Sequence, residues 1–333
     1  MFQMSRLKRH YEASFHTTGP CGPLPLVFDG HLVYGPFKPL NTEGFEIGGF
    51  ETLYNCSGIM EMDDGKKIIA VRYEAFNNEL GSVVLGHIDE DGLIILDGPR
   101  FGCAQDPTFA KIAGKIILSF NGYTSANAKI TSVRQYFYFL DDLTRPFAIG
   151  PLGQKCCRLI DLPGNKIGIM GRRQDWPIMR GQLTYTEIDS LAQLQEAISQ
   201  AELIGPITNN NCWLGANQLL PLDSRGRYIG ILGHIAELIS GKSTGGAEKK
   251  RYFATASVFD RKTKRIIAMN IIADAADLPF KEDAKMNLLD RVIYPGGLVR
   301  QKGPFHYRLY GGYGDIRCFY WDLNIPLFDQ YED

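Results

Sequence analysis

Residues 113–122 read Ala113-Gly114-Lys115-Ile116-Ile117-Leu118-Ser119-Phe120-Asn121-Gly122. The segment combines a glycine-containing turn, a basic residue, an apolar run and a polar end, which indicates a buried β-strand after a tight turn. The same phrase occurs at residues 64–73, 164–173, 225–234 and, in a weaker form, 303–312. The chain is therefore built from repeats of one strand unit.

The spacing of these repeats predicts the fold. Their first glycines, starting at Gly65, follow one another after 49, 50, 62 and 77 residues. Periods near 50 residues are typical of propeller blades, and longer intervals indicate insertions in loops. A second strand-like run follows each copy, so each repeat supplies the hairpin that a blade requires. These runs are 82–88, 135–140, 182–188, 252–259 and 316–321.

We therefore predict an all-β fold, a single five-bladed β-propeller domain over residues 1–333, with an N-terminal extension at 1–24 and short helical and loop insertions. One insertion is a helix at 190–201, where apolar residues share one face. Another is a mobile loop at 240–250, rich in Gly, Ser and Lys. A β-sandwich with fortuitous repeats is the alternative fold.

Composition bears on the partners, metal sites and disulfides that the protein could have. The net charge is −1 and charged residues make up 22% of the chain, so nothing favours a nucleic-acid or membrane partner. Seven cysteines, with Cys156 and Cys157 adjacent, fit neither a zinc site nor a disulfide framework and indicate free, mostly buried thiols. No metal-ligand spacing is present. With no apolar run behind the basic N-terminus, we predict a cytoplasmic protein.

Polar residues end the repeated strands. Because the innermost strands of a propeller line its central channel, we expect these ends to converge on one pocket, although mutual pairing or solvation would also account for them. The residues are Arg72, Asn121, Arg172, His234 and Asp315.

An Asp-Pro element precedes the second repeat, in the segment Gln105-Asp106-Pro107-Thr108-Phe109. Proline fixes its own φ and pushes the preceding residue toward an extended conformation, which would aim the Asp106 carboxylate into the channel. A structural turn between blades is the alternative reading.

This element resembles the Glu-Asp-Pro-Arg element of glycoside hydrolase family 130, which contains inverting β-mannoside phosphorylases and β-1,2-mannosidases on five-bladed propellers. Four further segments resemble that family in chain order: Asn55-Cys56-Ser57-Gly58, the blade from Lys155 to Arg172, Leu214-Gly215-Ala216-Asn217 and Tyr294-Pro295-Gly296-Gly297. A closer match is a sister family, domain of unknown function 1861 (the MTP-1 family), similar to mannosyltransferase/phosphorylase proteins. The phrases 70–74 and 105–107 carry it best. The chain departs from family 130 at Gln105, Thr108 and Gly171, which replace Glu, Arg and His.

The balance of charged groups favours phosphorolysis. A hydrolase of the inverting type needs two separated carboxyl groups, whereas a phosphorylase needs one acid and basic residues that hold phosphate. Asp106 is the expected general acid, acting through a sugar hydroxyl as the resemblance implies. The candidates for phosphate binding are Arg134, Lys155, Arg172 and His234, and those for sugar binding are Asn55, Ser57, Arg72, Asn121 and Asp315.

The sequence thus predicts a β-mannoside phosphorylase, acting on β-1,2-linked manno-oligosaccharides and forming mannose 1-phosphate. It would use inorganic phosphate as co-substrate and no other cofactor. Its partners would be an oligosaccharide or sugar phosphate, and a homo-oligomer stays open. A hydrolase with Asp315 or Glu237 as second carboxylate and a non-catalytic sugar-binding propeller are the competing hypotheses. Trp176 and Trp213 are candidates to stack on a sugar face, with core or loop packing as the plainer role.

Overall fold

A computed structural model describes residues 19–28, 30–34, 43, 51–75, 80–127, 129–174, 181–204, 212–239, 248–280, 282, 284–286, 289–303 and 306–332. Strands dominate this part of the chain, and the predicted all-β character is confirmed. None of the described helices has the length and apolar character needed to cross a membrane. All seven cysteines are free thiols, and Cys56, Cys156, Cys157 and Cys318 are buried.

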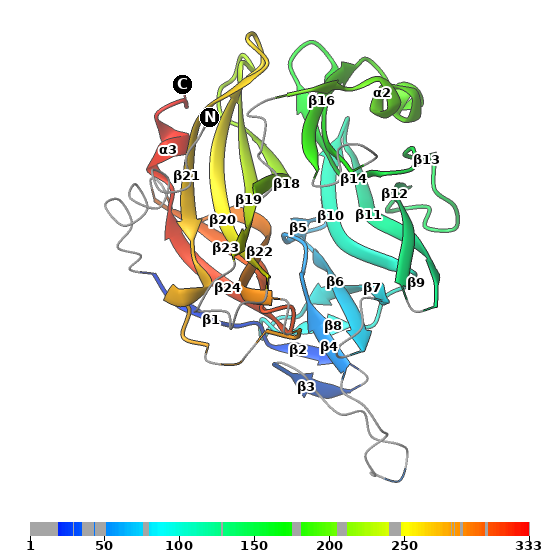
Figure 1. Cartoon of the computed structure of the whole chain (residues 1–333), viewed down its shortest axis with the longest axis vertical. Helices are drawn as coiled ribbons and strands as arrows, with labels where there is room; N and C mark the ends of the chain where they lie inside the picture. The colour runs from blue at the N-terminus through cyan, green and yellow to red at the C-terminus, as the bar shows by residue number, and fades with distance from the viewer. Residues whose placement is uncertain are drawn as a thin grey trace.

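The strands form five successive groups, each with an antiparallel meander of three strands at its centre. The meanders are β4 (Glu51–Tyr54), β6 (Lys67–Ala75) and β7 (Gly81–Ile88); β10 (Ala104–Ile112), β11 (Lys115–Ala126) and β12 (Lys129–Phe139); β14 (Gln154–Leu162), β15 (Lys166–Arg173) and β16 (Gln182–Ile188); β18 (Cys212–Pro221), β19 (Tyr228–Ile239) and β20 (Lys249–Asp260); and β22 (Leu289–Arg300), β23 (His306–Tyr313) and β24 (Arg317–Asn324). Figure 1 shows these groups in chain order around a common centre.

Shorter strands complete the groups at their outer edges. The first group adds β2 (Leu26–Phe28), β3 (His31–Val33), β8 (Ile94–Leu96) and β9 (Arg100–Gly102), and the next three add β13 (Ala148–Ile149), β17 (Glu202–Leu203) and β21 (Arg265–Ala273). The short β5 (Met60–Glu61) instead pairs with β6 on the same side as β4. In the last group β1 (Cys21–Pro23) pairs with β24, so residues 21–23 of the predicted N-terminal extension belong to this sheet. One parallel contact, β20 with β22, joins the fourth and fifth groups.

Helical segments lie between strands and are short. The helix predicted at 190–201 is confirmed as the 3-10 turn η1 (Leu191–Gln193) followed by α2 (Leu194–Gln200), with a capping box between Ser190 and Gln193 at its start. The others are η3 (Ala275–Asp277) and α3 (Pro326–Asp329). The predicted loop at 240–250 lies outside the described residues except for its end, where β20 begins.

Apolar side chains fill the spaces between consecutive groups. One core cluster joins each group to the next, and a further cluster, which contains Leu53, Val71 and Cys318, joins the last group to the first. Tyr185 and Phe259, for example, meet at 4.6 Å between ring centroids across the third and fourth groups. Burial of such faces on both sides is the main favourable term that holds neighbouring sheets together.

The repeated phrases occupy a different place from the one predicted. They form β6, β11, β15, β19 and β23, the second strand of each meander, and residues 304–305 of the fifth phrase lie outside the described residues. The strand before each phrase lies nearest the centre, because residues of β10, β14, β18 and β22 line the central pocket. The ends of the phrases still reach that pocket, since Arg72 pairs with Tyr54, Asn121 with Gln105 and Arg172 with Lys155 in the innermost strands or beside them.

Candidate functional site

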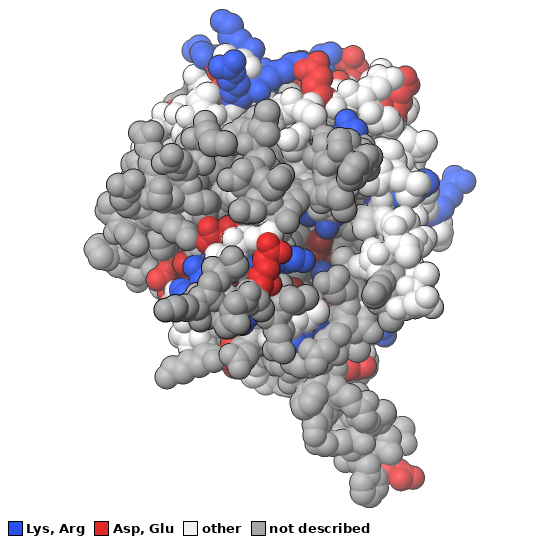
Figure 2. All heavy atoms as spheres, in the orientation of Figure 1, with Lys and Arg blue, Asp and Glu red and all other residues white. Residues whose placement is uncertain are grey.

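A cavity of about 530 Å³ lies where the innermost strands meet. Figure 2 shows charged atoms of both signs in a hollow at the centre of this face. Seven of the ten residues predicted to act in catalysis, phosphate binding or sugar binding line it: Asn55, Arg72, Asp106, Lys155, Arg172, His234 and Asp315. The structure therefore brings together side chains from all five strand groups, as the repeat pattern led us to expect.

Irregularities at matching places in the innermost strands aim side chains into this cavity. The strand register shifts between Gln105 and Thr108 in β10 and between Lys155 and Arg158 in β14, with similar shifts in β18 and β22. A bulge of this kind interrupts the alternation of side chains and re-aims one of them. The bulge in β10 interrupts the alternation of side chains between the two faces of the strand, and Asp106 therefore faces the pocket.

The backbone of Asp106 contradicts the prediction from Pro107. Its φ is +54°, a left-handed conformation, not the extended one that a following proline favours. The bulge overrides the local preference, and Asn55 and Cys156 occupy corresponding positions in neighbouring groups with φ of +49° and +55°. Non-glycine residues adopt this region at a cost, and such strain gathers at functional sites.

Asp106 is buried, with 8% of its surface exposed, and each carboxylate oxygen has a polar partner. Arg72 Nη1 donates to Oδ1 at 3.3 Å, and Asn121 Nδ2 donates to Oδ2 at 3.0 Å. Burial raises the pKa of Asp106, but the surrounding cations outweigh it and the net pKa is lowered. Asp106 is therefore ionised at neutral pH. These cations are Arg72, Lys155, Arg158 and Arg172.

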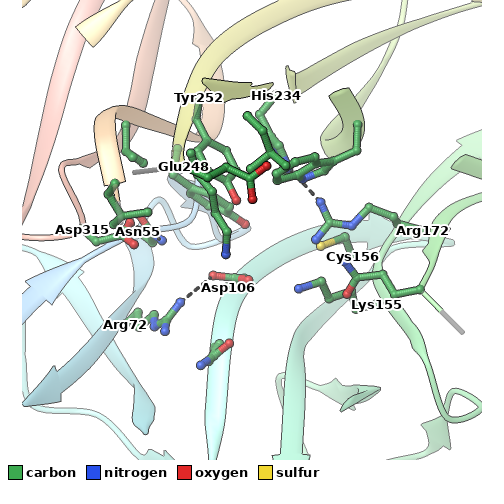
Figure 3. A pocket seen from close by; sticks show the side chains of 18 residues that line it. Asn55, Arg72, Asp106, Lys155, Cys156, Arg172, His234, Glu248, Tyr252 and Asp315 are labelled. Carbon is green, nitrogen blue, oxygen red and sulfur yellow. Dashed lines mark hydrogen bonds and ion pairs between the residues drawn. The ribbon is translucent and has the colours of Figure 1, made fainter. Parts of the chain in front are cut away.

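Lys155 and Arg172 lie on the other side of the pocket from Arg72 (Figure 3). Neither makes an ion pair with a carboxylate among the described residues, and Nε of the buried Arg172 has no hydrogen-bond partner there. Burial, and then the charge of Arg172, lower the pKa of Lys155. Two cations that oppose each other in a partly dry pocket favour a bound anion, which would stabilise both.

His234 has both ring nitrogens engaged by its neighbours. Nε2 lies 2.9 Å from Arg172 Nη1, and Nδ1 lies 2.8 Å from Oδ1 of Asn217. A guanidinium can only donate, so Nε2 accepts and the proton resides on Nδ1. Burial, and then the charge of Arg172, hold the pKa of His234 well below its usual range. His234 is thus a neutral acceptor that orients Arg172, and the structure offers no ring N–H for phosphate.

Three other predicted residues do not line the pocket. Arg134, a predicted phosphate ligand, is exposed on β12, the third strand of its meander, and is not among the residues that line the pocket. Ser57 is buried and structural: its hydroxyl accepts from Ala70 N–H at 3.0 Å and donates to Gly58 O at 2.7 Å. Asn121 does not line the pocket either, but it holds Asp106 and accepts from Cys156 N–H at 2.9 Å.

Asn55 and Asp315 form the wall of the pocket next to Arg72 (Figure 3). Asn55 Nδ2 lies 3.5 Å from Asp315 Oδ1. Both residues have positive φ, which turns them out of their strand ends toward the cavity. Their amide and carboxylate groups are the kind that bind sugar hydroxyls. Glu237, the alternative second carboxylate, lies 3.9 Å from Arg251 and does not line the pocket.

Aromatic rings make the wall next to His234. Trp213 packs edge-on against Tyr252 with centroids 5.9 Å apart, and His234 lies 6.0 Å from the ring of Tyr294. Trp213 is only 8% exposed, so packing is its main role, although it lines the pocket as predicted. Trp176 lies outside the described residues.

Several lining residues escaped the sequence analysis as functional candidates. They are Gln174, Glu248, Lys250, Tyr252 and Cys156, together with Tyr294, which was noted only as part of a motif. Cys156 could have been found from the repeat, because it follows Asp106 by one blade period of 50 residues. No periodic signal marks Glu248 or Lys250.

The departures from the resemblance have physical counterparts. A Cβ at Gly171 would lie 2.4 Å from Nε2 of Gln154, so a larger side chain where family 130 has histidine would require Gln154 to move. Gln154 fills that space and donates to Thr184 at 3.0 Å. Thr108 is buried and its hydroxyl points to the carbonyl of Asn217 at 3.5 Å, away from the pocket lining.

Comparisons with known proteins agree on this architecture. A family model described as a protein of unknown function (DUF1861) matches residues 41–327. A search of curated proteins found no match.

Three solved structures share the fold. The mannose phosphorylase MPT-4 from Leishmania mexicana, in complex with a phosphate ion, is 24% identical with a TM-score of 0.79, covering 99% of this chain and 95% of that one. The GDP-Man-dependent mannosyltransferase MPT-1 from Leishmania mexicana is 23% identical with a TM-score of 0.81, covering 99% and 96%. The β-1,2-mannobiose phosphorylase from Listeria innocua is 13% identical with a TM-score of 0.57, covering 89% and 94%.

Proposed function

We propose that this chain, which belongs to the DUF1861 family by the match over residues 41–327, is an inverting glycoside phosphorylase acting on β-mannosides. We further propose that the fold is a single five-bladed β-propeller; the ring of core clusters between consecutive strand groups supports this reading. The β-1,2 linkage, the absence of a cofactor other than phosphate and the cytoplasmic location stay predictions.

One observation carries the proposed function: Asp106, the one buried carboxylate among the described residues that line the pocket, faces Lys155 and Arg172, two cations that form no ion pair with a carboxylate among the described residues. In the proposed reaction, phosphate lies between these cations and one of its oxygens attacks the anomeric carbon. The bond between that carbon and the glycosidic oxygen breaks, and the leaving oxygen takes a proton that originates from Asp106. Sugar 1-phosphate of inverted configuration and the shortened oligosaccharide are the products.

The ionised state of Asp106 suits the synthetic direction of this reaction, and phosphorolysis requires that Asp106 first gain a proton. In synthesis from sugar 1-phosphate, the carboxylate accepts the proton of the acceptor hydroxyl as a general base. In phosphorolysis the acid form is needed. A phosphate anion next to Lys155 and Arg172 offsets their charge, which raises the pKa of Asp106 when the nucleophile is in place. Proton affinity and phosphate occupancy are thereby coupled.

A hydrolase is the second candidate, because a second carboxylate, Asp315, lines the same pocket. It would need Asp315 to activate a water on the face of the sugar opposite to the acid. Asp315→Asn separates the two: a hydrolase loses turnover, whereas a phosphorylase keeps phosphate-dependent turnover and changes its KM for sugar.

The proposal is tested by incubating the purified protein with a panel of sugar 1-phosphates and monosaccharide acceptors and measuring released phosphate. Mannose 1-phosphate with a mannose-containing acceptor is expected to release phosphate and form a disaccharide. The absence of phosphate release from every donor would refute the phosphorylase.

A further inference from the structure

Four buried side chains of alternating charge contact one another in a row that ends at Asp106. Its members are Lys285, Glu74, Arg72 and Asp106, in that order. Lys285 lies between η3 and β22, Glu74 and Arg72 lie on β6, and Asp106 lies on β10, so three parts of the ring meet in it. Sequence analysis gave no role to Lys285 or Glu74.

The contacts among these four residues are close, and all four residues are buried. Lys285 Nζ pairs with Glu74, whose side chain is fully buried, and donates to Tyr54 Oη at 3.2 Å. Glu74 Oε2 accepts from both Nε and Nη2 of Arg72, at 2.9 and 2.7 Å. Gly81, the strand partner of Glu74, leaves room for this carboxylate, since a Cβ there would lie 3.0 Å from Oε2.

Arg72 is therefore held from one side and presents its remaining Nη1 to the other. Nη1 donates to Asp106 at 3.3 Å, while Nε and Nη2 face Glu74. The ring of Tyr54 lies under both cations, 4.8 Å from the guanidinium of Arg72 and 5.0 Å from Lys285 Nζ. Lys285 and Glu74 themselves are absent from the pocket lining, so they make no direct contact with a ligand in the pocket.

We infer that Lys285 and Glu74 are positioning residues that act on Asp106 through Arg72, fixing the guanidinium against the carboxylate and setting the net charge that it faces. The catalytic consequence rests on the proposed function, whereas the electrostatic coupling does not. Because the charges alternate, removing the carboxylate of Glu74 means that it no longer offsets the charge of Arg72. The full charge of Arg72 then acts on Asp106 and lowers its pKa. Burial, and then the charge of Arg72, lower the pKa of Lys285 to about 7, so Lys285 is cationic over the acidic range in which Asp106 titrates. Removing it leaves Glu74 to offset Arg72 and raises the pKa of Asp106.

The other titratable and charged groups around Asp106 are the same in the wild type and in the variants of Lys285 and Glu74. Burial, and then the charge of Asp106, raise the pKa of Tyr294, which faces it from β22. The remaining groups near Asp106 or elsewhere in the same pocket are Lys155, Cys156 and Arg158 on β14, Arg172 on β15, His234 on β19, Glu248 and Lys250 at the start of β20, and Asp315.

The test is a titration of Asp106 in the whole, substrate-free protein. Aspartate labelled with ¹³C at the carboxyl carbon is followed by NMR against pH, and the Asp106 signal is assigned by its loss in Asp106→Asn. In Lys285→Met the midpoint is expected to rise by about one unit, the size that a charge several Å away produces in a partly buried site. In Glu74→Gln the carboxylate is expected to stay ionised to lower pH than in the wild type.

Matched controls carry the same chemical changes at exposed ion pairs. Glu202→Gln removes the partner of Lys264, and Lys111→Met removes the partner of Asp63; neither is expected to move the signal. Thermal unfolding shows which variants are folded, and Lys285→Met alone decides the matter if Glu74→Gln does not fold.

Shifts in the same direction for both variants, or an unmoved midpoint in folded Lys285→Met, would overturn the inference. The acid limb of kcat/KM for synthesis should move with the NMR midpoint. If the wild type has no such activity, the proposed function fails while the titration still decides the coupling.

Discussion

The imidazole of His234 lies close to Gly215, its partner across β18 and β19: a Cβ at Gly215 would come within 2.2 Å of the ring. The same Cβ would lie 3.0 Å from Arg172 Nη1. Glycine at this position therefore lets the ring reach both Asn217 and Arg172, and a single backbone site controls the geometry of the proposed anion pocket.

We predict that Gly215→Ala weakens phosphate use more than it weakens stability. Displacing His234 removes the acceptor that holds Arg172, so KM for phosphate should rise about tenfold or more, in line with loss of one hydrogen bond to a charged group. Steady-state kinetics with phosphate varied measures this. Gly102→Ala is the control, because nothing lies within 4 Å of a Cβ there. An unchanged KM in Gly215→Ala would remove His234 from the account.

The protonation of His234 gives a second prediction. Its pKa is about 6.5 in the unfolded chain and well below that in the folded protein. The unfolded state therefore binds a proton that the folded state does not, and stability falls as the pH drops below 6.5. The slope of unfolding free energy against pH between 5 and 6.5 should be shallower in His234→Gln. ¹⁵N NMR should show the wild-type ring neutral, with its proton on Nδ1; a cationic ring near pH 6 would contradict the assignment.

The phosphate ligands can be distinguished by substitution. Lys155→Met and Arg172→Met should each raise KM for phosphate by about 10- to 100-fold, since each removes a charge-assisted contact to the anion. Arg134→Met should leave it unchanged, because Arg134 is exposed and outside the pocket. All three variants replace a basic side chain by methionine, so each removes one positive charge and the comparison is matched. A large effect at Arg134 alone would place the anion elsewhere.

A stabilising change is predicted in the hairpin between β10 and β11. Ala113 and Gly114 both have positive φ, +49° and +77°, the pattern of a type I′ turn, which favours Asn-Gly. Ala113→Asn should therefore stabilise the fold by about 0.5 to 1 kcal/mol by relieving left-handed strain. Denaturant unfolding measures the change. Ala113→Val, which is β-branched, should do the reverse.

The fold was accessible from the sequence because it repeats. Five copies of one phrase, each with a following strand, predicted the hairpins that the structure contains. The helical spacing of apolar residues predicted α2. The position of each phrase within its sheet was not accessible, because the innermost strands carry bulges that interrupt the alternation by which strands are recognised. The same bulge reversed the expected backbone conformation of Asp106.

The site was accessible only where polar residues recur in register with the repeat. Asn55, Arg72, Asp106 and Arg172 follow that pattern and line the pocket. Arg134 was misplaced because its strand lies third from the centre, which position along a repeat does not reveal. Lys285 was missed because it lies in a connection between strands, where no period applies, and its partner Glu74 is close only in the folded chain.

The central claim is that turnover at Asp106 transfers a mannosyl group to phosphate. It is tested by ³¹P NMR of the purified protein with β-1,2-mannobiose, with and without inorganic phosphate. We expect α-mannose 1-phosphate to form only when phosphate is present, and turnover in Asp106→Asn to fall by about 10²- to 10⁴-fold, while Asp63→Asn, an exposed change of the same kind, keeps it. Release of free mannose at the same rate without phosphate, or full activity in Asp106→Asn, would contradict the account.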